Sequence, residues 1–334
     1  MRLFVNTAHH LLRRRDMVQA IEILGQRCVL GELLGEGGMG RVFRSEHPLG
    51  FPLAVKLLGP RCRGERGMER RLLREAHAAA RVGHPAVVRV IDYGRCRDGE
   101  PFVAMLRIEG EPLGVAIQRQ GPLSITHLRA VAIQVLLGLG AIHRARLVHA
   151  DIKSDNVLVE PAVPEPRATI IDFGLACTPS TETIDELSGT PDYMAPEVIS
   201  GARPTRASDL YAIGVILYEM LTGTTPFVGA TTAMVFDGHL HEALVPPSLR
   251  CPDRTIPPSL ERLVMRALSK DPAHRPHDAE LFATAIDRAA VPMRGDKWRR
   301  TPAVFSTTAT TRDWATPRSR EPFEDHVIRP RRLG

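Results

Sequence analysis

At 334 residues the chain is long enough for one large domain or two modest ones, with a sizeable core in either case. Its hydrophobic content of 43% and charged content of 25% are ordinary for a globular protein. The net charge of +6 is spread along the chain without basic residues interleaved with aromatic ones, which argues against a nucleic-acid partner.

The cysteines and the apolar runs indicate in which cellular compartment the protein is expected. Five scattered cysteines without a C-x-x-C pair argue against a disulfide framework or a zinc site and fit a reducing environment. The longest apolar stretches, at 131–142 and 210–221, are too short to span a bilayer. No apolar run with a small-residue cleavage site follows residue 1. We therefore expect a cytoplasmic protein without a membrane span.

The first third of the chain predicts a β-rich unit. Residues 1–27 form an extension in which the amphipathic stretch 8–24 predicts a surface helix or a frayed terminus. From residue 28 onward five β-like runs follow: "CVLGELLG", "RVFRSEH", "FPLAVKLLG", "AVVRVIDYG" and "PFVAML". One helical segment at 67–82 interrupts them. We expect a mostly antiparallel sheet with one helix over about 28–105.

Helical periodicity dominates from residue 113, with helices expected at 124–144, 206–221, 258–269 and 277–290. Residues 291–334 are rich in Pro, Thr, Ser and Arg without apolar periodicity, and predict a disordered tail. The expected fold class is α+β with two lobes. A small β-rich N-lobe precedes a larger α-helical C-lobe at about 109–290, and the cleft between them is the expected ligand site.

The stretch "LGEGGMGRV" at 34–42 fits the pattern G-x-G-x-x-G-x-V through Gly35, Gly37, Gly40 and Val42. Glycines at these positions let backbone amides approach phosphates without a Cβ in the way. A dinucleotide-binding fold would instead need a helix opening at the glycines and an acidic residue about 20 positions further on. A strand-like run follows here and position 60 is proline, so that alternative fails on context.

Lysine usage marks a second candidate position. Only four of the 44 basic residues are lysine, which suggests that a compact ammonium is needed where lysine is kept. Lys56 lies in the strand-like "LAVKLL", and alternation places it with Ala54 on the face turned toward the cleft. It can bind nucleotide phosphates if an acid fixes its position, and Glu75 is the natural candidate for that acid.

Together with motifs further along, these residues resemble the eukaryotic-type (Hanks-type) serine/threonine protein kinases of bacteria over about residues 28–290. The motifs that carry the resemblance are "AVKLL", "HADIKSDN", "DFG", "GTPDYMAPE", "SDLYAIGVILYEMLTGTTPF" and "DPAHRP". The resemblance implies that Asp209 braces the loop that contains Asp151, and that Arg275 pairs with Glu197. It also implies that His149 has a structural role.

The resemblance assigns roles in phosphoryl transfer, which depends on positioning and charge neutralisation. Asp151 is expected to accept the proton of a protein Ser or Thr hydroxyl, Lys153 to reach the transferring phosphate, and Thr190 to support both. Asn156 and Asp172 are expected to bind Mg²⁺ or Mn²⁺. The residues expected at ATP are Leu34, Gly35, Glu36, Gly37, Gly38, Met39, Gly40, Arg41, Val42, Ala54, Lys56, Glu75, Met105, Leu106, Ile108 and Leu158.

Ala150 departs from the family pattern, in which an arginine usually precedes the catalytic aspartate. Because that arginine pairs with a phosphate on the activation segment, its absence predicts activity that does not depend on phosphorylation there. A nucleotide-binding pseudokinase is the alternative, and a small-molecule kinase is disfavoured by "GTPDYMAPE". The tail threonines at 301, 307, 308, 310, 311 and 316 are candidate autophosphorylation sites, with an inert linker equally compatible.

Overall fold

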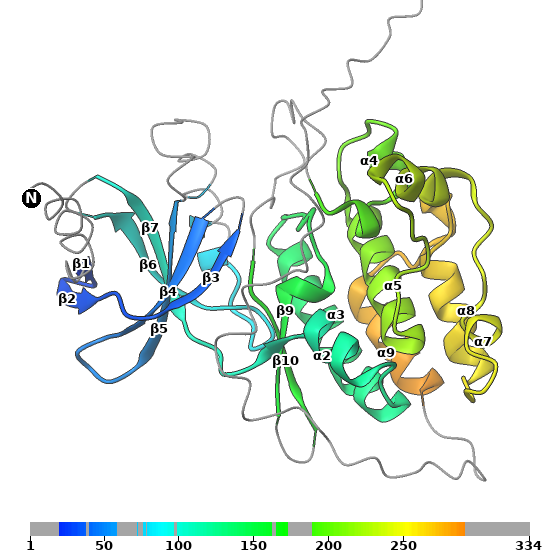
Figure 1. The fold of residues 1–334 in the computed structure, drawn as a ribbon, viewed down its shortest axis with the longest axis horizontal. Coiled ribbons are helices and arrows are strands. Elements are labelled where there is room, and N and C mark those ends of the chain that lie inside the picture. Colours follow the sequence, from blue (N-terminus) through cyan, green and yellow to red (C-terminus); the bar gives the residue numbers. More distant parts are fainter. Residues whose placement is uncertain are drawn as a thin grey trace, which may run out of the picture.

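The computed structural model describes residues 20–290 apart from 38–39, 59–71, 73–75, 78, 97–98, 162–164 and 173–188. A β-rich part is followed along the chain by a larger helical part, as Figure 1 shows. The main sheet has five strands in the order β3-β4-β5-β7-β6, all antiparallel. Its strands are β3 (Leu33–Gly37), β4 (Gly40–Glu46), β5 (Pro52–Leu58), β6 (Val90–Arg95) and β7 (Pro101–Leu106). The predicted α+β fold class is confirmed.

The two faces of this sheet pack against different partners because side chains alternate along each strand. One face contributes the odd-numbered residues of β5, including Val55, and the even-numbered residues of β7 to a cluster with the N-terminal residues 21–30. The other face contributes Leu58 and Val103 to a cluster with Leu72 and Ala76. Residues 72, 76–77 and 79–80 are helical, as the segment 67–82 predicted.

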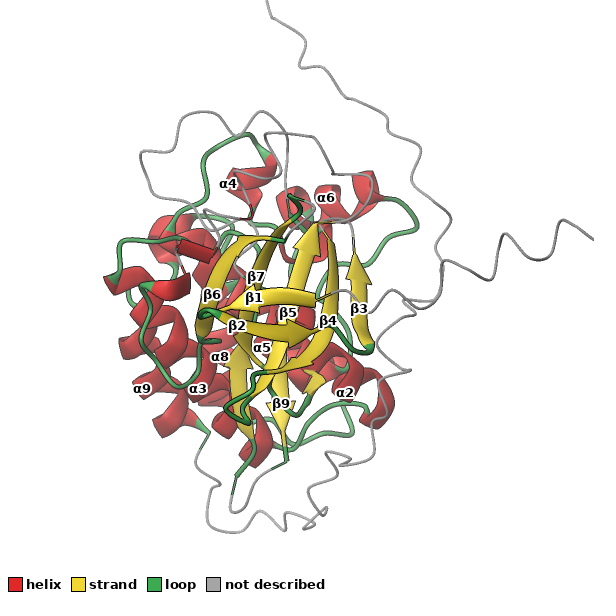
Figure 2. Cartoon of the chain, turned by 90° about the vertical axis from the view of Figure 1, so that its left-hand side faces the viewer, coloured by secondary structure: helices red, strands yellow, loops and turns green. Residues whose placement is uncertain are grey.

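The expectation of a surface helix at 8–24 is wrong for its last residues. Ala20–Ile23 forms strand β1, which pairs with β2 (Gln26–Val29) through a turn at Leu24 and Gly25, both with positive φ. Figure 2 shows this hairpin lying across the strands of the main sheet. Ile21 and Ile23 are buried there, so the folded lobe begins before residue 28. Residues 1–19 lie outside the described part of the chain.

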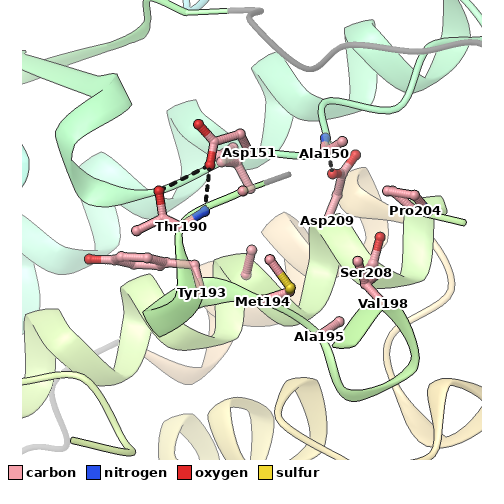
Figure 3. A pocket seen from close by; sticks show the side chains of 13 residues that line it. Ala150, Asp151, Thr190, Tyr193, Met194, Ala195, Val198, Pro204, Ser208 and Asp209 are labelled. Atoms are coloured by element: carbon pink, nitrogen blue, oxygen red, sulfur yellow. Dashed lines mark hydrogen bonds between the residues drawn. The ribbon is translucent and has the colours of Figure 1, made fainter. Parts of the chain in front are cut away.

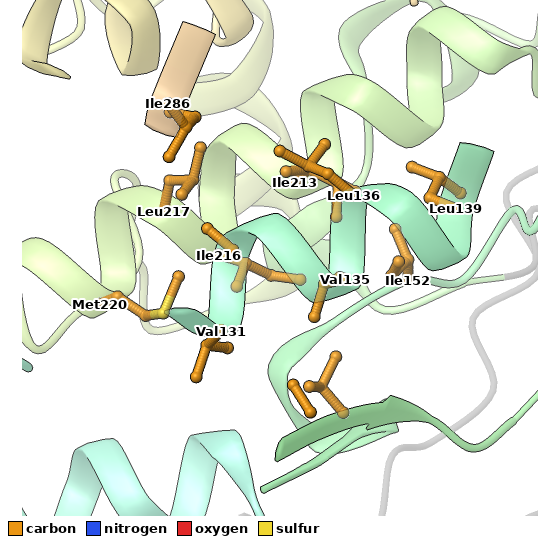
Figure 4. Close-up of a cluster of buried hydrophobic side chains, with 14 of the residues drawn as sticks. Val131, Val135, Leu136, Leu139, Ile152, Ile213, Ile216, Leu217, Met220 and Ile286 are labelled. Carbon is orange, nitrogen blue, oxygen red and sulfur yellow. The ribbon is translucent and has the colours of Figure 1, made fainter. Parts of the chain in front are cut away.

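The helical part is built around α3 (Ile125–Arg144) and α5 (Arg206–Thr222), whose apolar side chains interdigitate with those of α9 (Ala279–Ala289) (Figure 4). Ser124 caps α3, since its side chain accepts a hydrogen bond from the His127 N–H. The remaining helices are α2 (Leu113–Gln120), α4 (Pro196–Ile199), α6 (Thr232–His241), α7 (Pro247–Arg250) and α8 (Pro258–Ala267). The four helices predicted here are confirmed, with ends that differ by up to two residues.

A second, three-stranded sheet lies within the helical part and was not predicted. It has the order β10-β9-β8 and contains β8 (Glu111–Pro112), β9 (Val157–Glu160) and β10 (Arg167–Ile170). Two 3₁₀ turns, η2 (Ser154–Asn156) and η3 (Pro191–Tyr193), flank the region that contains the predicted site, and a third, η4 (Pro272–His274), precedes Arg275. The strand β9 begins directly after Asn156, so the sheet sets the position of the loop before it.

Among the described residues, α3 is the one helix long and apolar enough to cross a membrane, and 67% of its apolar window is buried inside the molecule. No disulfide joins the three described cysteines, Cys28, Cys96 and Cys251. The tail 291–334, with its candidate threonines, lies outside the described residues.

Candidate active site

Asp209, near the start of α5, holds the loop at 149–156 in place. The Asp209 carboxylate accepts the backbone N–H groups of His149 and Ala150, each at 2.9 Å. His143 Nε2 lies 2.8 Å from the same carboxylate. Because Asp209 is 1% exposed, these bonds form away from water, where a hydrogen bond to a charged group stabilises most. The bracing role expected for Asp209 is confirmed.

Ala150 has a left-handed backbone, with φ 65°. This conformation costs roughly 1 kcal/mol for a residue with a Cβ, so surrounding contacts must hold it. The bond from the Ala150 N–H to Asp209 supplies such a contact. The backbone turn at residue 150 is therefore kept although the arginine side chain of the family pattern is absent.

His149 is fully buried, and burial lowers the pKa of its imidazole. Its Nδ1 accepts the N–H of Asp151 at 3.4 Å, and Asp172 lies close enough to the ring to affect its pKa. A neutral imidazole that bonds to the backbone of the loop has a structural role, as the sequence predicted, and is not placed to remove a substrate proton.

Asp151 lies at the centre of a set of hydrogen-bond donors. Its Oδ1 accepts both the N–H and the Oγ1–H of Thr190, each at 3.1 Å. Its Oδ2 lies 3.1 Å from the ammonium of Lys153, and Lys153 Nζ also donates to Thr190 Oγ1 at 2.6 Å. The arrangement holds the carboxylate in one orientation, with a cation beside it.

Asn156 and Asp172 lie side by side because the Ile171 N–H donates to the Asn156 carbonyl at 3.0 Å. The Asn156 Nδ2 donates to the Asp151 carbonyl at 2.8 Å, which leaves the amide oxygen as the side chain's acceptor. An amide oxygen and a carboxylate are hard oxygen donors of the kind Mg²⁺ prefers. The described residues contain no cluster of three or more His, Cys, Asp or Glu that could hold a metal. Two protein ligands still fit Mg²⁺, which keeps waters and binds substrate phosphates.

Lys56 reaches this pair of residues from the β-rich part. Its ammonium lies 3.1 Å from Asp172 Oδ1, and only 7% of the residue is exposed. Glu75, the acid expected beside Lys56, lies outside the described residues. In the sheet register Val42 lies opposite Lys56 and Ala54 lies opposite Met105, so all four share the face turned toward the site.

The predicted glycine loop connects β3 to β4, and Gly37 pairs with Gly40 where the two strands meet it. A Cβ on Gly40 would lie 2.2 Å from the Leu57 carbonyl oxygen, so only glycine fits this close approach of two strands. Gly38 and Met39 lie outside the described residues, whereas Leu34 is buried and Glu36 is exposed. Arg41 faces away toward Glu100, at 3.9 Å, and Phe43.

The segment joining the two parts of the fold is held through its backbone. The Leu106 N–H donates to the Arg89 carbonyl at 3.0 Å, and the Arg107 N–H donates to the Pro52 carbonyl at 3.1 Å. Leu106 and Ile108 are half-buried, and Leu158 of β9 is buried. These are residues that the sequence assigns to the adenine, and that role stays a prediction.

A small pocket opens beside Asp151 (Figure 3). Its walls are mainly apolar and come from the residues after Thr190 and from the start of α5. They include Ala150, Met194, Ala195, Val198, Pro204 and Ala212. Asp151, Thr190 and Asp209 also line it, so the pocket places polar and apolar groups side by side.

The 189–197 segment is joined to the rest of the fold at its far end by the expected ion pair. Arg275 donates to both oxygens of Glu197, each at 2.7 Å, and is fully buried. Its guanidinium also donates to the carbonyls of Ala207, Ser269 and Lys270 and stacks on the Tyr211 ring. The expected pairing of Arg275 with Glu197 is confirmed.

Sequence reasoning missed one group of residues at this site. Ser154 Oγ lies 2.8 Å from the Tyr193 hydroxyl, which donates to Glu219 Oε2 at 2.7 Å. Burial raises the pKa of Glu219 to about 7 and that of Tyr193 well above its usual value. No spacing in the sequence identifies this group, because its members come from η2, η3 and the last turn of α5. Ser154 lies inside a motif, but its contacts depend on the tertiary fold.

Comparison with known proteins gives one family. The family described as "Protein kinase domain" matches residues 28–285. Serine/threonine-protein kinase pkn3 of Myxococcus xanthus is 40% identical over 263 residues, which cover 76% of this chain and 48% of that protein. PkaB of Streptomyces coelicolor is 35% identical over 279 residues, covering 81% of this chain and 64% of PkaB. PknH of Mycobacterium tuberculosis is 34% identical over 264 residues, 78% of this chain and 41% of PknH. The chain therefore spans less than two thirds of the length of each of these relatives.

Proposed function

The chain belongs to the protein kinase family, and we propose that it is an active serine/threonine protein kinase that transfers the γ-phosphoryl group of ATP to protein hydroxyls. The observation that supports this best is the environment of Asp151. Its carboxylate accepts two hydrogen bonds at 3.1 Å from the N–H and hydroxyl of Thr190, and it forms an ion pair at 3.1 Å with the ammonium of Lys153. A carboxylate held in this way can accept a proton without changing its orientation.

In the proposed reaction, the substrate oxygen attacks the γ-phosphorus while the bond to the β-phosphate oxygen breaks. The hydroxyl proton passes to the Asp151 carboxylate, and ADP leaves. Lys153, beside Asp151, is placed to neutralise charge on the transferring group, and Lys56 to bind the other phosphates. Asn156 and Asp172 would hold Mg²⁺, which would supply charge neutralisation at the ATP phosphates.

The pocket beside Asp151 supports a protein substrate. Its lining joins apolar side chains such as Met194 and Val198 to the Asp151 carboxylate, a combination that suits the polypeptide around an accepting hydroxyl. A lysine at 153 with Thr190 beside it matches the pattern that the family uses for Ser and Thr. We propose that the protein acts in the cytoplasm and without a nucleic-acid partner.

The competing hypothesis is a nucleotide-binding pseudokinase. The two are separated by Asp151→Asn and Lys56→Met, assayed with labelled ATP, Mg²⁺ and a generic basic protein. Removing the proton acceptor or the phosphate-binding lysine should lower the rate by roughly a hundredfold or more, while the fold is kept. The matched control is Lys270→Met. Lys270 donates to the carbonyls of Gly238 and His239, away from the site. Its loss should therefore leave the turnover rate within about twofold of the wild-type rate. A wild-type protein that binds ATP but transfers no label would support the pseudokinase.

We also propose autophosphorylation of the tail, where six threonines lie on an arginine-bearing stretch at 301–316. Mass spectrometry of purified wild type and of Asp151→Asn tests this. Phosphate on the tail of the wild type alone supports the proposal. Phosphate confined to residues 173–188 would contradict it.

A further inference from the structure

Three buried side chains form a hydrogen-bonded chain across the site, and we call them the hydroxyl network: Ser154 of η2, Tyr193 of η3 and Glu219 of α5. Their exposed fractions are 2%, 8% and 8%. The two links measure 2.8 Å and 2.7 Å. The network therefore joins the 149–156 loop to the 189–197 segment and joins both to the central helix.

The direction of these bonds follows from the protons available. The pKa of Tyr193 is raised well above its usual value by burial, so its hydroxyl keeps its proton at neutral pH. The Tyr193 hydroxyl uses that proton to donate a hydrogen bond to Glu219. The Tyr193 oxygen then accepts a hydrogen bond from the Ser154 hydroxyl. Each hydroxyl uses its one donor, and removal of either breaks the connection.

Ser154 has little freedom to turn away from Tyr193. A Cβ placed on Gly114, at the start of α2, would lie 2.8 Å from Ser154 Oγ and 3.0 Å from Asp155 Oδ1. The backbone of α2 therefore closes the other side of the serine. Ser154 lies next to Lys153 and two residues before Asn156, so its position sets where these two side chains begin.

We propose that Ser154 and Tyr193 are positioning residues for phosphoryl transfer, which hold the 149–156 loop and the 189–197 segment in register. This connection uses neutral hydroxyls and is complete without a phosphate, in a chain where Ala150 offers no cation to bind one. The inference rests on the proposed kinase function. Ser154 and Tyr193 thereby order the 189–197 segment in part, a role that an arginine–phosphate pair would otherwise have.

The test compares Ser154→Ala, Tyr193→Phe and the double variant with wild type in steady-state assays. Each single variant should lower kcat by about tenfold, which corresponds to the free energy of one lost hydrogen bond. The KM for ATP should stay within about twofold of the wild-type value. Both changes break the hydrogen bond between Ser154 and Tyr193. The kcat of the double variant should therefore lie within about twofold of the kcat of the slower single variant.

Two matched controls separate positioning from lost stability. Tyr218, the neighbour of Glu219 in α5, is a buried tyrosine that donates to the Val245 carbonyl at 3.0 Å. Ser45 is a buried serine that donates to the Val29 carbonyl at 2.8 Å. Tyr218→Phe and Ser45→Ala should lower the melting temperature as the test variants do, and leave kcat within about twofold.

The outcome is read together with amide hydrogen exchange of residues 189–195, which needs no catalysis. Exchange there should be faster in Tyr193→Phe than in wild type and unchanged in Tyr218→Phe. Additive losses of kcat in the double variant, or unchanged exchange in Tyr193→Phe, would overturn the inference. A wild type that transfers no phosphate would overturn the proposed function instead, and the exchange result would still decide on the network.

Discussion

The two ends of the 189–197 segment are held by different chemistry. At the far end, Glu197 forms a bidentate ion pair with Arg275, with both bonds at 2.7 Å. At the near end, Thr190 and Tyr193 use hydroxyl groups to reach Asp151 and Ser154. Charge is used away from the site and neutral groups are used next to it, where a second fixed cation would compete with Lys153 for Asp151.

The difference follows from what each end must do. Arg275 is fully buried, and its remaining N–H groups are taken up by backbone carbonyls, so this end has one favourable arrangement. Neutral hydroxyl bonds are individually weaker, about 1 kcal/mol each, and can be formed or broken without moving charge out of water. We expect changes at the Arg275 end to reduce stability and changes at the Thr190 end to reduce turnover.

The largest expected effect is on stability, at the ionic end. Arg275→Met leaves Glu197 and three carbonyl oxygens without their buried donor, and should lower the free energy of unfolding by about 3–5 kcal/mol. The control is Arg129→Met, which removes a partly exposed arginine that contacts Glu165 and Asp287 and should cost at most about 1 kcal/mol. Urea unfolding measures both. Equal losses in the two variants would contradict the difference between the ends.

The second effect is a pH dependence that originates in the hydroxyl network. The pKa of Glu219 is raised to about 7 mainly by burial; the nearby carboxylates of Asp155 and Asp192 also raise it, and the hydrogen bond from Tyr193 lowers it. The folded protein thus binds a proton more tightly than the unfolded chain. Stability from this group is complete below the ordinary glutamate pKa and is lost as the pH rises through about 7.

Glu219→Gln removes this titration while keeping a side chain of the same shape. Relative to the variant, the wild type should lose about 3 kcal/mol of unfolding free energy between about pH 5 and about pH 8. His239, whose pKa burial lowers to about 4, titrates in both proteins and cancels in the comparison. Urea unfolding at several pH values tests this, and parallel curves for the two proteins would show that Glu219 does not titrate in this range.

The third effect is on turnover, at the hydroxyl end. Thr190→Val keeps the shape of the side chain but removes the donor to Asp151 and the acceptor for Lys153. It should lower kcat by about tenfold to a hundredfold, with unfolding free energy changed by no more than about 1 kcal/mol. Thr190→Ser retains the hydroxyl and should recover most of the rate. Equal rates for the two variants would show that the hydroxyl has no part in the reaction.

Sequence reasoning predicted those parts of the fold that depend on local pattern. The helices α3, α5, α8 and α9 have long apolar periods and clear ends, and strands β3 to β7 alternate or are bounded by turn residues. The β1–β2 hairpin was mistaken for part of a helix because Ile21 and Leu24 are also three residues apart. Ile21 and Ile23 alternate with polar or small residues directly before Leu24–Gly25, and this strand-like pattern followed by a turn predicts the hairpin.

The site shows the same division between local pattern and tertiary contact. Motif spacing predicted Lys56, Asp151, Lys153, Asn156 and Asp172, and the structure brings all five together, while their catalytic roles stay predictions. Tyr193 and Glu219 are 26 residues apart, and in the sequence an acidic residue near the end of an apolar helix only interrupts the apolar pattern. Only the packing of η3 against α5 turns that carboxylate into a partner for a hydroxyl.

The smallest expected effect concerns the five Ser and Thr residues that lie in the sequence between Asp172 and Gly189. Thr178, Ser180, Thr181, Thr183 and Ser188 lie outside the described residues. If the hydroxyl network and Asp209 already order the site, replacing all five with alanine and treating the protein with phosphatase should lower activity by less than about tenfold, or about 1.4 kcal/mol in the barrier. A larger fall would show that a cation elsewhere binds a phosphate on this stretch.

Ala150→Arg is the complementary change. The left-handed backbone at residue 150 is already formed and bonded to Asp209, so arginine there meets the same backbone cost as alanine. The new cation has no phosphate to pair with in the five-alanine protein, and it lies one residue from the Asp151 carboxylate. We therefore expect Ala150→Arg to be slower than wild type in that background and to be restored when the five hydroxyl residues are present and phosphorylated. Assays of the four proteins, with and without phosphatase, measure this. Equal activity of Ala150→Arg in all backgrounds would mean that residue 150 does not determine whether this kinase responds to phosphorylation.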